Sequence, residues 1–271
     1  MRSVGFLDTV VPAVRRSLEE PGYDRGVPPR RKGSPPSFGG AIRSDPAHRA
    51  VLVEYKRVSP GRSDAPLPLR AVSEFLARTA GAPVAAFSCL ATMPEFRGSP
   101  ADVSELAAQS PLPVLFKEFV VDPRQLEVAA RTGASAVLLI ARLPDGGRKV
   151  APLSDLADAA HRLGLEVVLE FHHRSELSRA AEVAADVYGV NSRNLDTLAI
   201  DRPTAIETLR AADRDGLRPL LGLSGVESPS DARAFWDAGV DGILVGSAVA
   251  RSKTPVKFLR SIRDVPRSRD P

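Results

Sequence analysis

The sequence has one cysteine and no long apolar run. Cys89 is the only thiol among the 271 residues, so no disulfide can form within the chain, and its apolar neighbours indicate a small core residue. No apolar stretch approaches the ~20 residues of a membrane-spanning helix. The first residues also lack the basic, apolar and small-residue pattern of a secretion signal. The sequence therefore predicts a cytoplasmic protein with no membrane partner.

Aromatic residues and clustered charge are scarce as well. Aromatics make up 5% of the chain, whereas hydrophobic residues, mostly Ala, Val and Leu, make up 43%. The 37 basic and 33 acidic residues are scattered and leave a net charge of +4. Nucleic-acid surfaces usually show a basic stripe interleaved with aromatics, so we expect no nucleic-acid partner. The one dense basic run, residues 25–32, stands among Pro and Gly and indicates a loop.

The length is close to the ~250 residues of one barrel domain, although length alone also allows two smaller domains. Apolar residues recur at helical spacing over residues 5–20, and a connection rich in Pro, Gly and Arg follows at 21–48. We expect that connection to be extended or poorly ordered. The predicted division is an N-terminal extension and linker at 1–48, a barrel at 49–265 and a tail at 266–271.

Short apolar runs alternate with helical patterns after this linker. The predicted strands are 51–55, 83–88, 113–116, 135–140, 166–170, 186–190, 218–222 and 242–245. The predicted helices are 67–80, 101–109, 123–132, 151–163, 174–184, 202–212, 228–238 and 255–263. Such alternation favours a parallel sheet covered by helices, and eight units predict closure into a (β/α)₈ TIM barrel. An open doubly wound sheet is the alternative, but the turn at 56–61 lacks its Gly-rich fingerprint.

Charged and amide side chains end several of these strands, where a buried strand should stay apolar. They include Glu54, Lys56, Lys117, Glu170 and Asn191. In a barrel the carboxyl ends of all strands meet at one rim, where active sites lie. Charges buried there without partners would destabilise the fold strongly. A shared acid–base site is therefore the simpler interpretation.

Two glycine–serine pairs follow the last two predicted strands. Ser224-Gly225 and Gly246-Ser247 would bring backbone N–H groups together at the rim. Barrels commonly bind phosphate in these two loops. The pattern therefore predicts a small-molecule substrate of the sugar-phosphate class.

The adjacent histidines His172 and His173 follow the fifth predicted strand. Neighbouring side chains on an extended segment point apart, and no third ligand is apparent. We therefore expect no metal at this pair.

Six segments together resemble the indole-3-glycerol-phosphate synthase family, in order and in register. They are 54–60 (EYKRVSP), 113–119 (PVLFKEF), 164–170 (GLEVVLE), 189–195 (GVNSRNL), 223–226 (LSGV) and 244–247 (LVGS). The resemblance implies a carboxy-lyase that closes the indole ring of an anthranilate-bearing deoxyribulose phosphate, with loss of carbon dioxide and then water. It implies tryptophan or specialised indole biosynthesis, no cofactor or metal, and a monomer or weak homodimer.

The resemblance also implies catalytic roles. Lys117 would be the general acid that protonates the substrate carbonyl, and Glu170 the second acid–base group, acting in the dehydration. Lys56 would hold the substrate carboxylate, and Glu54 would pair with both lysines. A lysine acts as an acid near neutrality only when its pKa is lowered. We therefore expect Lys56 to lower the pKa of Lys117.

The other implied site residues bind or position the substrate. They are Asn191, Ser224, Ser59, Phe96 and Arg193, with Gly225, Gly246 and Ser247 at the phosphate. Phe96 would pack against the anthranilate ring, and Arg193 would serve the phosphate end. The N-terminal helix and Ser37-Phe38 match a family segment that covers the barrel mouth.

Two positions depart from the family pattern. Leu223 stands where the family usually has Glu, so a carboxylate expected near Lys117 is missing. The family's S-P-S loop also reads Ser59-Pro60-Gly61 here. An altered-substrate or non-catalytic relative that keeps the phosphate cradle is one alternative. A phosphoribosyl isomerase is another, but the Cys-Asp or Asp-Asp pair of such enzymes is not found. The retained lysines and glutamates favour an active synthase.

Overall fold

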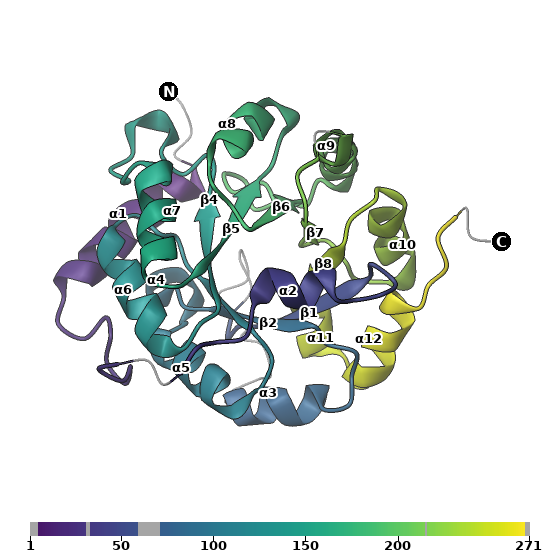
Figure 1. Cartoon of the computed structure of the whole chain (residues 1–271), viewed down its shortest axis with the longest axis horizontal. Helices are drawn as coiled ribbons and strands as arrows, with labels where there is room; N and C mark the ends of the chain where they lie inside the picture. Colours follow the sequence, from purple (N-terminus) through teal and green to yellow (C-terminus); the bar gives the residue numbers. More distant parts are fainter. Residues whose placement is uncertain (1–4, 31–32, 59–70, 215, 269–271) are drawn as a thin grey trace.

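A closed barrel of parallel strands forms the centre of the molecule (Figure 1). The computed structural model describes residues 5–30, 33–58, 71–214 and 216–268. In this part of the chain eight strands pair in sequence order, and β1 also pairs with β8. Their bounds are β1 Ala50–Tyr55, β2 Ala86–Leu90, β3 Val114–Lys117, β4 Ala136–Ile140, β5 Glu166–Phe171, β6 Val187–Asn191, β7 Leu220–Leu223 and β8 Gly242–Val245. The predicted TIM barrel is confirmed.

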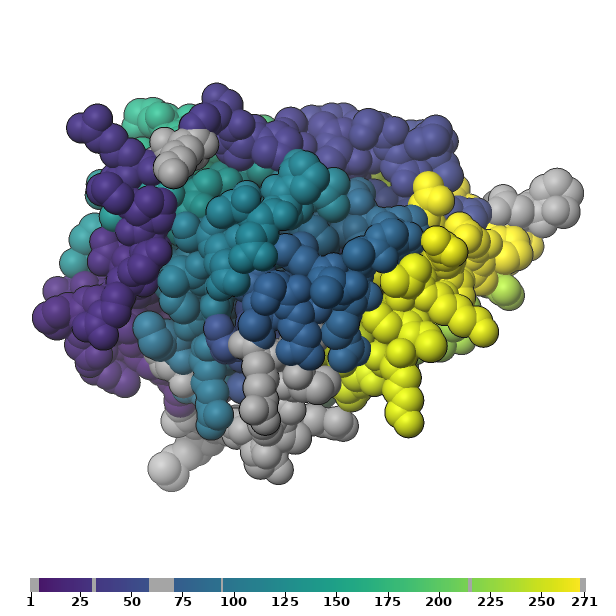
Figure 2. Space-filling view, turned by 90° about the horizontal axis from the view of Figure 1, so that it is seen from below, coloured from purple at the N-terminus to yellow at the C-terminus, as the bar shows by residue number. Residues whose placement is uncertain are grey.

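Helices surround this barrel. Their bounds are α1 Phe6–Glu19, α2 Phe38–Arg43, α3 Val72–Thr79, α4 Met93–Phe96, α5 Pro100–Gln109, α6 Pro123–Thr132, η1 Asp145–Gly147, α7 Leu153–Arg162, η2 Arg174–Glu176, α8 Leu177–Glu182, α9 Arg202–Arg214, α10 Pro229–Asp237, α11 Ser247–Arg251 and α12 Pro255–Arg263. The last helix, α12 (yellow), packs beside α3 (blue), so the outer ring also closes (Figure 2). None of the helices in the described segments has both the length and the apolar character needed to cross a membrane.

Local sequence signals explain where the outer helices begin. Asp122 accepts a hydrogen bond from the backbone N–H of Arg124 and precedes Pro123, and Ser228 caps α10 in the same way. A side-chain cap followed by proline satisfies the first free amides and presets the helical backbone. The division at residues 48 and 265 stays a prediction.

The apolar core has two parts, because strand side chains alternate between the two faces of the barrel wall. One part lies between the strands and the outer helices. The other fills the barrel and includes Leu52, Val168 and Leu244. Along β1 the inward row that contains Leu52 continues to Glu54 and Lys56. The same alternation that fills the barrel with apolar side chains therefore points these two charges into its mouth.

Helix α2 closes the end of the barrel where the strands begin. The backbone N–H groups of Phe38 and Gly39 donate to the two carboxylate oxygens of Glu166, the first residue of β5, at 2.9 and 2.7 Å. Phe38 and Ile42 are fully buried. The expectation that Ser37-Phe38 covers the mouth is wrong, because the chain must reach this opposite end to begin β1. The linker also holds a helix where an extended connection was predicted.

Helix α1 reaches the other end, the mouth. The backbone N–H of Phe6 donates to the carbonyl of Asp196 in the loop after β6, at 3.3 Å. Asp8 forms an ion pair with Arg148 at 2.8 Å. The apolar face of α1 joins the same core cluster that fills the barrel. The predicted helical extension over the barrel mouth is therefore confirmed for α1.

Candidate active site

Two connected hollows open at the carboxyl ends of the strands. The first has a volume of about 570 Å³, and its lining is partly aromatic and partly charged. The second has a volume of about 710 Å³, and its lining includes the glycine-rich loops after β7 and β8. Glu54, Lys56, Arg193 and Ser224 line both hollows, so the two are continuous.

Glu54 lies between the two lysines. Its Oε1 is 2.7 Å from the Nζ atom of Lys56, and its Oε2 is 2.8 Å from the Nζ atom of Lys117. Burial disfavours the charged form of the Glu54 carboxyl, but the ammonium groups of Lys117 and Lys56 outweigh it and lower its pKa to about 2. Glu54 is therefore ionised at neutral pH and holds both lysines.

The pKa values of the two lysines shift in opposite directions. Burial lowers the pKa of Lys56 despite its contact with Glu54, and the nearby Lys117 charge adds to that effect. Burial also opposes the charge on Lys117, but the carboxylates of Glu54 and Glu170 outweigh it and raise the pKa of Lys117. The expectation that Lys56 lowers the pKa of Lys117 is wrong, because two carboxylates determine the environment of Lys117.

Glu170 at the end of β5 is buried, with 1% of its surface exposed. Its Oε1 accepts a hydrogen bond from the Asn191 Nδ2 atom at 3.0 Å. Its Oε2 is buried and has no hydrogen-bond partner in the described part of the chain. Burial raises the pKa of the Glu170 carboxyl, against the opposing effects of Lys117 and Asn191. Because Glu170 lines the cavity, this carboxyl can exchange a proton with a bound molecule.

Three phenylalanines form one wall of the first hollow. The ring of Phe6 meets Phe96 and Phe119 edge-on, with centroids 6.1 and 6.0 Å apart, and Phe96 stacks on Phe119 at 6.2 Å. Sequence reasoning found Phe96 but missed the other two rings. Phe119 stands two residues after Lys117, where a loop side chain could be recognised as part of the rim. Phe6 gave no such signal, because it is distant in sequence.

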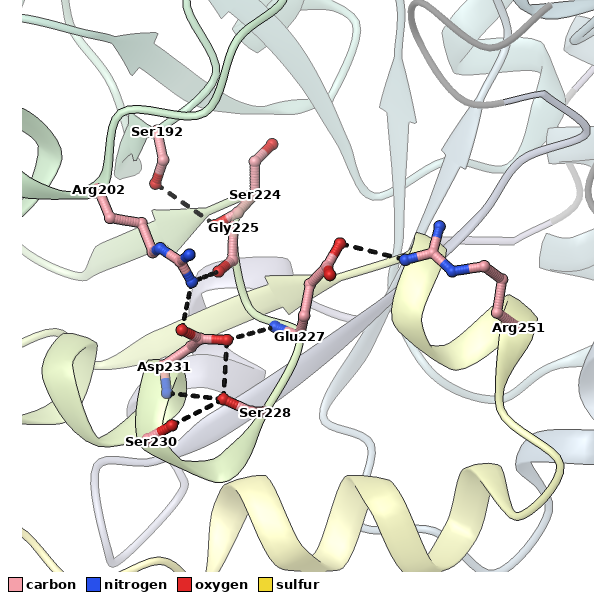
Figure 3. Close-up of polar contacts among 9 residues, drawn as sticks. All are labelled: Ser192, Arg202, Ser224, Gly225, Glu227, Ser228, Ser230, Asp231 and Arg251. Atoms are coloured by element: carbon pink, nitrogen blue, oxygen red, sulfur yellow. Dashed lines mark hydrogen bonds and ion pairs between the residues drawn. The ribbon is translucent and has the colours of Figure 1, made fainter. Parts of the chain in front are cut away.

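The loop after β7 has an unusual backbone. Ser224 and Gly225 have φ values of +63° and +79°, in the left-handed region that few non-glycine residues adopt. The Ser192 hydroxyl donates to the Ser224 carbonyl at 3.4 Å, and Arg202 donates to the Gly225 carbonyl at 3.2 Å (Figure 3). Arg202 also pairs with Asp231. The side chain of Ser224 points away from these bonds (Figure 3).

Gly246 and Ser247 form the other side of the second hollow. A Cβ atom on Gly246 would lie 2.8 Å from Glu54 Oε1 and 3.1 Å from the Lys56 Nζ atom. Glycine is therefore needed here for the charged cluster as well as for access to the backbone. The Arg193 Nη1 atom donates to the Leu198 carbonyl at 2.6 Å, which anchors the guanidinium beside both hollows.

Leu223 is 2% exposed and belongs to the core cluster that fills the barrel. It fits against Gly189, where a Cβ atom would lie 2.8 Å from Leu223 Cδ1. Ser59 lies outside the described residues, so its predicted role stays a prediction.

Glu118 is a buried carboxyl at the cavity, and sequence reasoning assigned it no role. Its Oε1 accepts hydrogen bonds from the Thr92 hydroxyl at 2.6 Å and from the Phe119 N–H at 2.8 Å. Burial raises the pKa of Glu118 to about 7. The described residues hold no group of three or more His, Cys, Asp or Glu side chains suited to a metal ion.

Solved structures with similar folds include 3-hexulose-6-phosphate synthase from Salmonella typhimurium. Its TM-score is 0.58 at 14% identity, covering 80% of this chain and 97% of that chain. Thiamine phosphate pyrophosphorylase from Pyrococcus furiosus gives a TM-score of 0.57 at 18% identity, covering 81% of this chain and 95% of that chain. At such identities the likeness shows the fold alone.

Proteins with similar sequences identify the family. An indole-3-glycerol phosphate synthase from Leifsonia xyli is 38% identical over 222 residues, covering 81% of this chain and 82% of the relative. One from Exiguobacterium sibiricum is 33% identical over 216 residues, covering 80% and 81%. The family model for indole-3-glycerol phosphate synthase matches residues 14–262. The chain therefore belongs to the indole-3-glycerol phosphate synthase family.

Proposed function

We propose that this protein is an indole-3-glycerol phosphate synthase. It closes the indole ring of an anthranilate-bearing deoxyribulose phosphate and releases carbon dioxide and water. The observation that carries the proposal is the meeting of Lys56, Lys117, Glu54 and Glu170 in one cavity that continues into a polar, glycine-lined hollow. Acid–base groups and an anion cradle are the two features this reaction requires.

The two hollows suggest how the substrate is oriented. Its anthranilate ring packs against the phenylalanine wall, because aromatic rings favour edge and offset contacts with one another. Its phosphate lies in the second hollow, near Arg193 and the backbone of Gly225, Gly246 and Ser247. A substrate held at both ends has its reacting atoms beside the lysines and Glu170. This placement lowers the entropic part of the activation barrier.

The charged residues divide the chemistry. Its raised pKa makes Lys117 a weaker acid than the sequence led us to expect, but keeps it protonated at neutral pH, so that it can donate to the substrate carbonyl as negative charge develops there during ring closure. Glu54 fixes the Lys117 ammonium group through the contact between Oε2 and Nζ. Lys56 holds the substrate carboxylate until carbon dioxide leaves. Glu170 is the second acid–base group and serves the loss of water, with Asn191 keeping its carboxyl in place.

Purified protein should convert the anthranilate-bearing deoxyribulose phosphate into indole glycerol phosphate, followed by product fluorescence. Lys117→Ala should reduce kcat by about 10²- to 10⁴-fold, the usual contribution of a general acid. Lys257→Ala removes an exposed lysine from α12 and should leave kcat unchanged. Bound substrate without turnover by the wild-type protein would refute the proposal.

A non-catalytic or altered-substrate relative is the second candidate, and Leu223 is the observation that favours it. A buried apolar residue stands where the family usually has a carboxylate. The two candidates differ in one measurement. A binding protein would hold the substrate without forming product, and Leu223→Glu would then create turnover. Turnover by the wild-type protein excludes the non-catalytic alternative.

A further inference from the structure

His172 lies next to Glu170 but has no part in the proposed reaction. Its side chain is 3% exposed, and its Nε2 atom is 3.5 Å from Glu170 Oε1. Neither ring nitrogen makes a hydrogen bond of normal geometry in the described part of the chain, although the backbone of Arg193 acts on the ring and opposes the fall in its pKa. A buried polar group without a partner lowers stability, so such groups usually have a purpose.

The ring of His172 is neutral at physiological pH. Burial, together with the nearby charges of Arg142 and His173, lowers its pKa to about 3. A neutral imidazole carries a proton on one nitrogen and a lone pair on the other. A proton on Nε2 faces the Glu170 carboxylate favourably, whereas a lone pair there would repel it. The geometry therefore favours the Nε2–H form.

The two carboxylate oxygens of Glu170 differ, because one accepts a hydrogen bond and the other has no partner in the described part of the chain. Oε1 accepts from Asn191 on β6, while Oε2 is buried without a partner. The charges that act on Glu170 come from Lys117 on β3 and Glu54 on β1. A carboxylate oxygen accepts two hydrogen bonds. A second donor on Oε1 would fix the plane of the carboxyl and leave Oε2 for the reacting molecule.

We propose that His172 is a positioning residue for Glu170. Its Nε2–H faces Glu170 Oε1 beside the bond from Asn191 and so directs Oε2 into the cavity, and this contact shortens when substrate is bound. The separation of 3.5 Å is long for a hydrogen bond. Hydrogen bonds of catalytic groups are often long in the empty enzyme and shorten in the complex.

The backbone around His172 supports this placement. The N–H of His172 lies 3.4 Å from the Oε2 atom of Glu176, in the turn η2 that follows β5. That contact restrains the position from which the ring extends. The adjacent His173 is exposed, so the two neighbouring histidines have opposite environments. This contrast supplies a matched control.

The test compares His172→Phe, which keeps a ring and removes both nitrogens, with His173→Phe. Its kinetic part rests on the proposed function. We expect His172→Phe to lower kcat about tenfold, because one hydrogen bond to a charged group is lost, with little change in KM. His172→Gln, which can place an N–H near the Nε2 position, should recover most of the rate. His173→Phe should match the wild type.

Two measurements do not require turnover. Carbon-13 NMR, with Glu170→Gln identifying the signal, should show Glu170 titrating about one pH unit higher in His172→Phe, because its carboxylate has lost a donor. Nitrogen-15 NMR of the wild-type protein should find the His172 proton on Nε2, and this measurement needs no folded variant. A proton on Nδ1, a charged ring at neutral pH, or equal kcat and Glu170 titration in the two phenylalanine variants would overturn the proposal. If the wild type shows no turnover, the proposed function fails while the NMR results still decide the role of His172.

Discussion

Three buried carboxyl groups at the mouth of the barrel ionise differently because their partners differ. The pKa of Glu54 is lowered to about 2 because two ammonium groups outweigh its burial. Burial raises the pKa of Glu118 to about 7, because the hydroxyl and the backbone N–H that bind it in the described part of the chain are uncharged and do not outweigh the burial. Burial also raises the pKa of Glu170, and there the Lys117 ammonium and the Asn191 amide act in the opposite direction. Burial alone therefore does not determine the protonation state.

Glu118 should make stability depend on pH. Its pKa in the unfolded chain is near the ordinary 4.5, and in the folded protein it is about 7. The unfolded chain releases this proton first, so the Glu118 contribution lowers the free energy of unfolding by about 3 kcal/mol as pH rises through this interval. Glu118→Gln keeps the Oε1 acceptor and cannot ionise. Urea denaturation should find it more stable than the wild type at pH 8 by about that amount, but not at pH 4.

A matched variant distinguishes this effect from a general loss of charge. Glu127→Gln makes the same substitution at an exposed position on α6. Its stability relative to the wild type should not change between the two pH values. An equal difference for Glu118→Gln at both pH values would contradict the role assigned to burial.

The site could be predicted from the sequence only in part. Polar residues at strand ends, such as Lys117 and Glu170, must reach the rim because the strands are parallel and their side chains alternate. Which side chains touch is not encoded in that pattern. The pKa of Lys117 was therefore predicted in the wrong direction, because Glu54 contacts it directly. The unpaired nitrogens of His172 depend on packing in the same way.

Helices α1 and α2 lie at opposite ends of the barrel. Each parallel strand starts at the same end, so the segment just before β1 must lie there. That reasoning would have placed α2 correctly, but the resemblance assigned Ser37-Phe38 to the mouth. The sequence did not predict helix α2, because this helix is six residues long and contains Gly39 and Gly40. The Ser37 hydroxyl, which accepts from the Gly40 N–H, was the available signal.

Glu166→Ala should separate stability from activity. The substitution removes the acceptor of two backbone N–H groups of α2, so the free energy of unfolding should fall by about 2 kcal/mol. Because Glu166 lies at the end opposite the cavity, kcat of the folded protein should not change. Thermal denaturation and kinetics well below the melting temperature check both outcomes. Glu166→Gln keeps one acceptor and should lose less stability, whereas a large fall in kcat would contradict this assignment.

The part of the chain that the structure describes leaves few large apolar side chains exposed. Among the described residues, the large apolar side chains classed as exposed are Met93 at 43% and Ile200 at 38%. Stable subunit interfaces usually need larger contiguous apolar patches. We therefore expect a monomer at micromolar concentration, with any homodimer weak. Sedimentation equilibrium should give the mass of one chain, and a dimer that persists on dilution to nanomolar concentration would contradict this expectation.

The order of elements was easier to predict than their limits. All eight strands were found because continuous apolar runs separated by helical periods are typical of a buried parallel sheet. The second strand was predicted at 83–88 but spans Ala86–Leu90. Its early residues, Pro83 and Val84, precede the barrel wall, and hydrophobicity alone does not distinguish such a lead-in from paired strand.

The pairing of the first strand with the last has a consequence for synthesis on the ribosome. Val51 and Val53 of β1 stand opposite Ile243 and Val245 of β8. During translation, one edge of β1 therefore stays unpaired until β8, near the C-terminus, has been synthesised. An exposed edge of this kind invites pairing with other chains. Translation arrested before Val245 should therefore yield fragments that aggregate rather than partly working enzyme.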